Sequence, residues 1–390
     1  MISLAEYSSR DGLGLAELVA RKEVTCEELV EAALAAIEKV NPKLNPVLQT
    51  LPDLAHAEIR KGLPRGPFAG VPFLIKELVL HARNVRCDQG SRLARGFVPR
   101  ADTELMARFR RAGLVLIGTT QTPEFGYNPT TETTLFGPVH NPWKEGHSAG
   151  GSSGGSGASV VAGIVAVAHA NDGGGSIRIP ASCNGLVGLK PTRDRVPTGP
   201  DSPIPCADWQ SSLLLDCVAG GDVGAPGLPV PPVRSYRDEV GADPSKTAHR
   251  VERYTCLRGI HPECARAVEE TGRLLEDAGH RLTEDRPHFD WDEYLEKVHV
   301  IWAAYNVLSA DFAAQTMGRK PGPDNLEAVT WACYEDGKRF SATDLLDSMA
   351  HGNLISRKVG AFFENYDVLV TPTIARPPVP HGEINQDQKA

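Results

Sequence analysis

Apolar residues recur at helical spacing in several stretches of the chain. Thr25 and Glu28 have the pattern of a capping box and open one such stretch, which we expect to end at Asn41–Pro42. This amphipathic start is typical of packing and carries no catalytic residues. Further helices are predicted over 102–112, 154–164, 261–279, 291–317 and 345–366.

Short uninterrupted apolar runs predict buried strands between these helices. The runs cover 71–75, 114–117 and 165–169, and a further strand is predicted over 367–370. Their alternation with helices indicates an α/β fold with a parallel or mixed sheet. Lys76 directly follows the first run, at the strand end where ligands collect in such sheets, although a lysine taken alone is more typical of a surface residue.

The remaining segments give weaker predictions. The long loop 118–143 is typical of a functional segment, and 185–191 predicts another apolar element closed by a turn. Residues 199–245 are dense in Pro, Gly and Asp, and 248–259 do not have the pattern of a buried strand. The polar tail from Pro377 is expected to fray, and no internal repeat is found.

Composition narrows the class of protein. A chain of 390 residues predicts two to three domains or one large α/β unit, and a net charge of −8 gives no basic surface for nucleic acid or an anionic membrane. Neither a signal peptide nor a spanning apolar run is present, so we expect a cytoplasmic protein. The eight cysteines lack C-x-x-C or zinc-finger spacing, which predicts reduced thiols and no metal.

The stretch 150–192 is the most unusual part of the chain. It contains Gly151-Ser152-Ser153-Gly154 and, further on, Gly174-Gly175-Ser176, with a small-residue apolar run over 160–168 between them. Such glycine density is typical either of a flexible linker or of a backbone that approaches a ligand and points N–H groups at it. A solvated linker has no use for the apolar run, so the pattern indicates a built site.

Three kinds of chemistry fit this stretch to different degrees. A phosphate-binding loop needs a lysine followed by Ser or Thr, but 150–159 has no lysine and Lys190 precedes a proline. A Ser–His–Asp hydrolase remains an alternative, since Ser153 partly matches Gly-x-Ser-x-Gly, although His147 and His169 are more typical of local hydrogen bonding.

The third possibility is a Ser–Lys mechanism. A lysine acts as a base only when burial and its neighbours lower its pKa from about 10.4. Lys76, at the end of a buried strand and facing hydroxyls, could meet that condition. The N–H groups of Gly173, Gly174, Gly175 and Ser176 could then bind a developing oxyanion.

Four motifs resemble the amidase signature family. They are 151–156 (GSSGGS), 172–180 (DGGGSIRIP), 188–192 (GLKPT) and 70–77 (GVPFLIKE). The resemblance covers roughly residues 10 to 200 well, with weaker similarity up to Thr371-Pro372-Thr373.

This resemblance implies a Ser–cisSer–Lys triad on a single large α/β domain, whose mixed, mostly parallel twisted sheet is wrapped by helices. Ser176 would be the nucleophile, Lys76 the base, and Ser152, after a cis peptide bond, the proton relay. Gly173, Gly174 and Gly175 would form the oxyanion hole. Ser153 would bond locally, and Asp172 and Arg178 would brace the turn.

The implied reaction is hydrolysis of a carboxylic amide to an acid and ammonia or an amine through an acyl-enzyme, without a cofactor. Residues 168–172 and 141–143 are most similar to bacterial amidases of small, aryl or linear amides, including the nylon-oligomer type. We expect a small-molecule amide substrate, no nucleic-acid or membrane partner, and the homodimer that the resemblance suggests.

Departures from the family leave alternatives open. We expect an N-terminal helical segment over 1–65, a catalytic core over 66–198, and a remainder over 199–390 that is atypical in 199–260 and shortened at the C-terminus. A catalytically silent or truncated scaffold of the family, or an amidotransferase A-type subunit, therefore remains an alternative to an active amidase.

Overall fold

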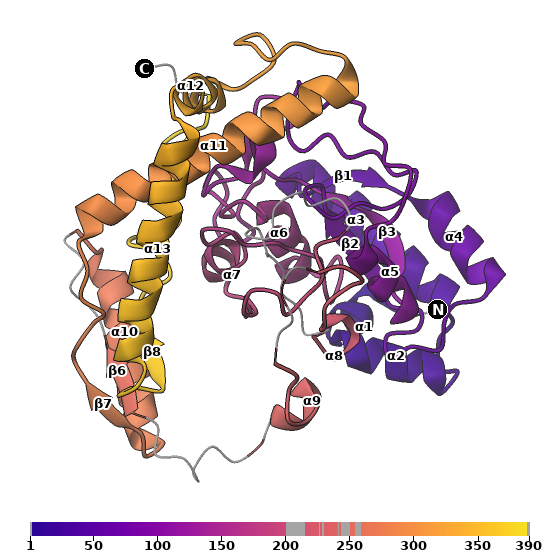
Figure 1. The fold of residues 1–390 in the computed structure, drawn as a ribbon. Coiled ribbons are helices and arrows are strands. Elements are labelled where there is room, and N and C mark those ends of the chain that lie inside the picture. Colours follow the sequence, from indigo (N-terminus) through magenta and orange to yellow (C-terminus); the bar gives the residue numbers. More distant parts are fainter. Residues whose placement is uncertain are drawn as a thin grey trace. The chain divides into compact units, whose positions relative to one another are not determined.

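The computed structural model describes residues 2–199, 215–225, 227, 230–240, 242, 250–253 and 259–387 (Figure 1). The chain forms two compact units. Unit 1 comprises Met1–Arg237, Asp324–Glu327 and Pro378–Ala390, and unit 2 comprises Asp238–Pro323 and Ala328–Pro377. The predictions that fall on 200–214, 243–249 and 254–258 lie outside the described residues.

Unit 1 is built around the strands β1 (Val47–Thr50), β2 (Pro72–Lys76) and β3 (Val115–Thr120), in the order β1-β3-β2. β2 runs parallel to β3, and β1 is antiparallel to it. Every residue of β2 and β3 is buried. Their continuous apolar runs are typical of parallel strands covered on both faces, which confirms the buried strands predicted over 71–75 and 114–117.

Helices surround this sheet in unit 1, and α3 (Cys26–Leu44), α4 (Pro52–Lys61) and α6 (Gly154–Val161) pack against its strands. The other elements of the unit are α1 (Leu4–Ser8), α2 (Gly12–Ala20), α5 (Glu104–Arg111), η1 (Glu124–Gly126), β4 (Glu132–Thr133), β5 (Gly137–Pro138), α7 (Arg178–Asn184), α8 (Leu215–Val218) and α9 (Tyr236–Glu239), which crosses into unit 2.

The predicted capping box of α3 is confirmed: Thr25 and Glu28 exchange both hydrogen bonds. The predicted end at Asn41–Pro42 is two to three residues too early, because the helix continues through Pro42 to Leu44 and is capped by Asn45, whose φ is 56°. Asn41 does act at this end, since its side chain exchanges hydrogen bonds with the backbone of Val47 at the start of β1.

Unit 2 contains a parallel sheet and a group of helices. The strands β7 (Arg281–Thr283), β6 (Arg250–Arg253) and β8 (Val368–Val370) pair in that order, and α10 (Pro262–Asp277) packs on β6 and β7. The helix α11 (Trp291–Met317) packs against α12 (Ala328–Gly337) and α13 (Ala342–Phe362) (Figure 1).

Four predictions outside the main elements are wrong. The segment 248–259, which lacks a strand pattern, supplies β6, because neighbours on both sides satisfy its backbone. The run 165–169 makes only one bridge, between Ala168 and Leu74, and 186–190 has no regular structure. The polar tail does not fray, because its residues up to 387 bond to unit 1.

Leu74 tests the buried core of unit 1. It is fully buried in β2, so Leu74→Ala should lower the free energy of unfolding by about 3 kcal/mol, from lost transfer energy and a residual cavity. Leu189→Ala, the same change at a half-exposed position of this unit, should cost less than about 0.5 kcal/mol in urea-induced unfolding. Equal losses in the two variants would contradict this packing.

Candidate active site

Lys76 is buried at the carboxyl end of β2 and bonds to two side chains. Its Nζ donates to Ser152 Oγ at 2.6 Å and to Asn171 Oδ1 at 2.5 Å. Both partners are neutral, and no carboxylate pairs with this ammonium group among the residues that the structure describes. A charged lysine is therefore poorly compensated here, since a buried charge needs an ionic partner to offset its lost hydration.

The surroundings of Lys76 shift its pKa. Burial lowers the pKa well below 10.5, and the nearby charge of Asp172 opposes this shift only partly. A lysine whose pKa is lowered loses its proton at a pH nearer to neutral, and the neutral amine then has a free lone pair that can accept a proton. This is the property that the Ser–Lys mechanism requires of its base.

Ser152 lies directly beside Lys76, in a tightly packed turn. The peptide bond between Gly151 and Ser152 is cis, as the family resemblance implies. A Cβ at Gly151 would lie 2.5 Å from the Asn128 carbonyl oxygen, and one at Gly126 would lie 3.2 Å from Ser152 Oγ. Only glycine fits at Gly151, so the residues 126–130 form the wall against which this turn is built.

Asn171 reaches Lys76 because its segment runs beside β2. Ala168 pairs with Leu74 in parallel register, and the His169 N–H donates to the Leu74 carbonyl at 2.8 Å. Asn171 Nδ2 donates to the Leu78 carbonyl at 2.9 Å, which leaves its Oδ1 directed at Lys76. The amide therefore orients the amine without adding a charge.

Asp172 organises the turn that holds Ser176. Its buried carboxylate accepts the N–H groups of Gly175 (2.8 Å) and Ile177 (3.2 Å) and binds the Arg178 guanidinium through two nitrogens (2.8 and 2.9 Å). Burial raises its pKa, but the hydrogen bonds and charge of Arg178, together with the N–H groups of Gly175 and Ile177, lower it overall. Both residues brace the turn, as expected.

Ser176 is half-buried in this turn, two residues before α7 begins. Gly175, which precedes it, has a φ of 130°, a conformation that favours glycine. The Gly175 N–H is bonded to Asp172 in this structure, so it would have to leave that carboxylate to bind an oxyanion. The oxyanion hole of Gly173, Gly174 and Gly175 stays a prediction. Ser153 makes a local bond to the Asn171 carbonyl at 3.3 Å.

Two further ionisable groups lie next to Lys76. His169 is buried beside Phe109, and burial together with the charge of Lys76 lowers its pKa to about 3, so its imidazole is neutral. Burial and the charge of Asp88 raise the pKa of Glu77 to about 8. Within the described part of the chain, His, Cys, Asp and Glu form no cluster that could hold a metal ion.

Sequence reasoning missed Asn171 and the wall formed by 126–130. The only sequence signal for a role of Asn171 in the site is its position directly before the motif 172–176. The wall comes from a loop far from Ser152 in sequence, so no local pattern could have indicated it.

Comparisons with known proteins identify the family to which the chain belongs. The family model for amidases matches residues 28–390. The 6-aminohexanoate-cyclic-dimer hydrolase of Paenarthrobacter ureafaciens is 33% identical to this chain, over 96% of this chain and 80% of that enzyme. A solved structure of a 6-aminohexanoate cyclic dimer hydrolase superposes with a TM-score of 0.91 at 30% identity, over 100% of this chain and 84% of that chain. The lipoamidase of Enterococcus faecalis is 32% identical over 96% of this chain and 51% of that enzyme.

The chain therefore belongs to the amidase family, and the likeness in fold confirms the expected α/β amidase signature fold. It is an enzyme of the class that hydrolyses amide C–N bonds. None of the helices in the described ranges combines the length and apolar character needed to cross a bilayer.

The raised pKa of Glu77 predicts that the free energy of unfolding depends on pH. Its pKa of about 8 exceeds the ordinary 4.5, so the folded state holds a proton that the unfolded state releases, and stability should fall as the pH rises from about 4.5 to about 8. Glu77→Gln cannot ionise, and its unfolding free energy relative to the parent should rise by on the order of 2 kcal/mol between pH 5.5 and 9.

Urea-induced unfolding at the two pH values measures this difference. Glu23→Gln, at an exposed position, serves as the control and should follow the parent at both. The same pH dependence in Glu77→Gln and the parent would contradict the prediction.

Proposed function

We propose that this protein hydrolyses a carboxylic amide through an acyl-enzyme on Ser176, with Lys76 as the base and Ser152 as the proton relay. The single observation that supports this most strongly is the buried contact of 2.6 Å between Lys76 Nζ and Ser152 Oγ. A lysine that is kept from water and bonded to a hydroxyl is suited to accept a proton.

The first half of the reaction forms the ester. Ser176 Oγ attacks the amide carbonyl carbon, its proton passes to Ser152, and the Ser152 proton passes to neutral Lys76. The N–H groups of Gly173 and Gly174 bind the resulting oxyanion, and the Gly175 N–H joins them if it leaves Asp172. The C–N bond then breaks as the proton returns along the same path to the leaving nitrogen, which departs as ammonia or an amine.

The second half releases the acid. Water attacks the ester carbonyl and gives a proton through Ser152 to Lys76. The bond between the carbonyl carbon and Ser176 Oγ then breaks, and the proton returns to Ser176. Each half returns Lys76 to its neutral form, so the cycle needs no cofactor.

The substrate class is an amide of a small acid, linear or cyclic. The relatives named 6-aminohexanoate-cyclic-dimer hydrolase support this choice, together with the sequence similarity at 168–172. A homodimer and a cytoplasmic location remain predictions.

A fluorophosphonate probe tests the nucleophile. The parent should be labelled on the peptide that contains Ser176, and Ser176→Ala should lose both the label and amide turnover, by about 10⁴-fold or more in kcat/KM. Ser153→Ala, in which the partial Gly-x-Ser-x-Gly match is removed, is the control and should keep the label. Labelling of Ser153, or of Ser176→Ala, would contradict the assignment. A parent that turns over none of a panel of aliphatic, aryl and cyclic amides would support the silent-scaffold alternative.

A second variant tests the base. Lys76→Met keeps the length and apolar stem of a buried side chain, and it should lower kcat/KM by about 10³-fold because no group accepts the Ser152 proton. In the parent, kcat/KM should rise with pH through an inflection below 10.5, because only neutral Lys76 is a base. Unchanged turnover in a folded Lys76→Met protein would rule out this role.

A further inference from the structure

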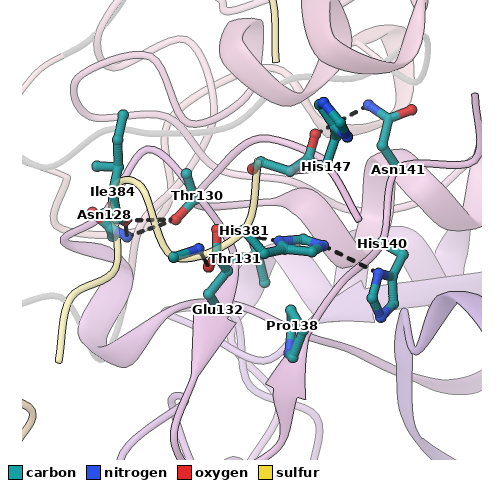
Figure 2. Close-up of polar contacts among 12 residues, drawn as sticks. Asn128, Thr130, Thr131, Glu132, Pro138, His140, Asn141, His147, His381 and Ile384 are labelled. Atoms are coloured by element: carbon teal, nitrogen blue, oxygen red, sulfur yellow. Dashed lines mark hydrogen bonds and ion pairs between the residues drawn. The ribbon is translucent and has the colours of Figure 1, made fainter. Parts of the chain in front are cut away.

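The C-terminal residues 378–387, here called the clasp, lie along the segment that leads into the Ser152 turn (Figure 2). The Ser148 N–H donates to the Val379 carbonyl, and the His381 N–H donates to the Gly146 carbonyl, both at 2.9 Å. Pro380 forms a bridge with His147 between these bonds. The clasp therefore pairs with 146–148, just before Gly151 and Ser152.

The same clasp bonds to a second segment, the loop 124–132. The Ile384 carbonyl accepts from Asn128 Nδ2 at 2.8 Å and from Thr130 Oγ1 at 3.0 Å (Figure 2). The Gly382 N–H donates to Glu132 Oε2 at 2.8 Å, and Gln386 Nε2 donates to the Glu124 carbonyl at 3.3 Å. These bonds hold the loop at its first residue, its middle and its last residue.

Side chains also contribute to the contact between the clasp and unit 1, and they gather around His381. Its Nε2 lies 3.1 Å from His140 Nδ1, and its Nδ1 lies 3.3 Å from Glu132 Oε1 (Figure 2). Gln386 and Thr130 are almost completely buried, with exposed fractions of 1% and 2%. The clasp is therefore a packed part of unit 1.

The loop 124–132 touches the Ser152 turn on its other side. Thr131 Oγ1 donates to the Gly150 carbonyl at 2.9 Å and accepts the Gly154 N–H at 3.2 Å. The Asn128 carbonyl leaves no space for a side chain on Gly151, and Gly126 lies against the Ser152 hydroxyl. The loop thus contacts both flanks of the turn and its serine.

We propose that the clasp positions Ser152, by holding the loop 124–132 against the turn that carries this serine. Thr130 and His381 are then positioning residues for the proton relay. The role in catalysis rests on the proposed function of Ser152, whereas the ordering of the turn by the clasp does not. A turn displaced from Lys76 would slow proton transfer more than substrate binding.

Thr130→Val and Thr130→Ser form the first test, since valine keeps the shape of threonine and serine keeps its hydroxyl. Thr130→Val should lower kcat about 10-fold with KM within about twofold, and slow the phosphonylation of Ser176 similarly, because small displacements of reacting groups are costly. Thr130→Ser should restore both rates to within about twofold of the parent. Thr119→Val removes a buried hydroxyl that has no partner within the described residues, and it should leave both rates unchanged.

Hydrogen exchange of the full chain separates positioning from general destabilisation. In Thr130→Val the amides of 124–132 and 150–154 should exchange faster, and those of α3 should not. Thr130 also accepts a hydrogen bond from Asn128, so Thr130→Val alone could act through Asn128. His381→Ala changes the clasp itself and should accelerate hydrogen exchange in the same two segments. His288→Ala, at an exposed position, should accelerate neither.

Two outcomes would overturn the proposal. One is faster exchange in 124–132 with no change in 150–154, and the other is faster exchange in 150–154 with unchanged kcat and phosphonylation in an active parent. If the parent neither turns over amides nor takes up the probe, the proposed function fails, and faster exchange in 150–154 of both variants would still support the ordering of this turn by the clasp.

Discussion

A lysine held in the interior by neutral partners is the constraint on which this site depends. Lys76 bonds to the hydroxyl of Ser152 and the amide of Asn171, and neither offsets a full positive charge. Its lowered pKa follows from that burial. The parallel pairing of β2 with β3 makes this burial possible, because it places Lys76 at the end of a buried strand, beside the turn at Ser152.

The glycines of the motif serve this arrangement in different ways. Gly151 leaves space for the backbone of 128–130, and Gly175 adopts a φ that other residues avoid. Asp172 then binds the N–H groups around Ser176 and keeps Arg178 beside them. The stretch does not serve as a flexible linker, because close packing and hydrogen bonds tie it to its neighbours.

Much of the fold was predictable where the local pattern is strong. The capping box of α3, the buried strands β2 and β3 and the helices α10 and α11 all follow from residue order. The errors fall where distant partners decide. Arg250–Arg253 pairs with two strands remote in sequence, and the polar tail is held by buried side chains such as Thr130. Neither segment has a periodic pattern of apolar residues that would predict these contacts.

The sequence by itself determined the family and the position of Lys76 at the end of a buried strand, and it supplied the residues of the proposed site. These depend on short motifs and on local periodicity, which survive without knowledge of the fold. Only the tertiary structure decided that Asn171 orients the lysine, that 124–132 packs against the Ser152 turn, and that 378–387 bonds to 124–132. The physical reason is that a hydrogen bond across many intervening residues is set by how the chain folds back on itself.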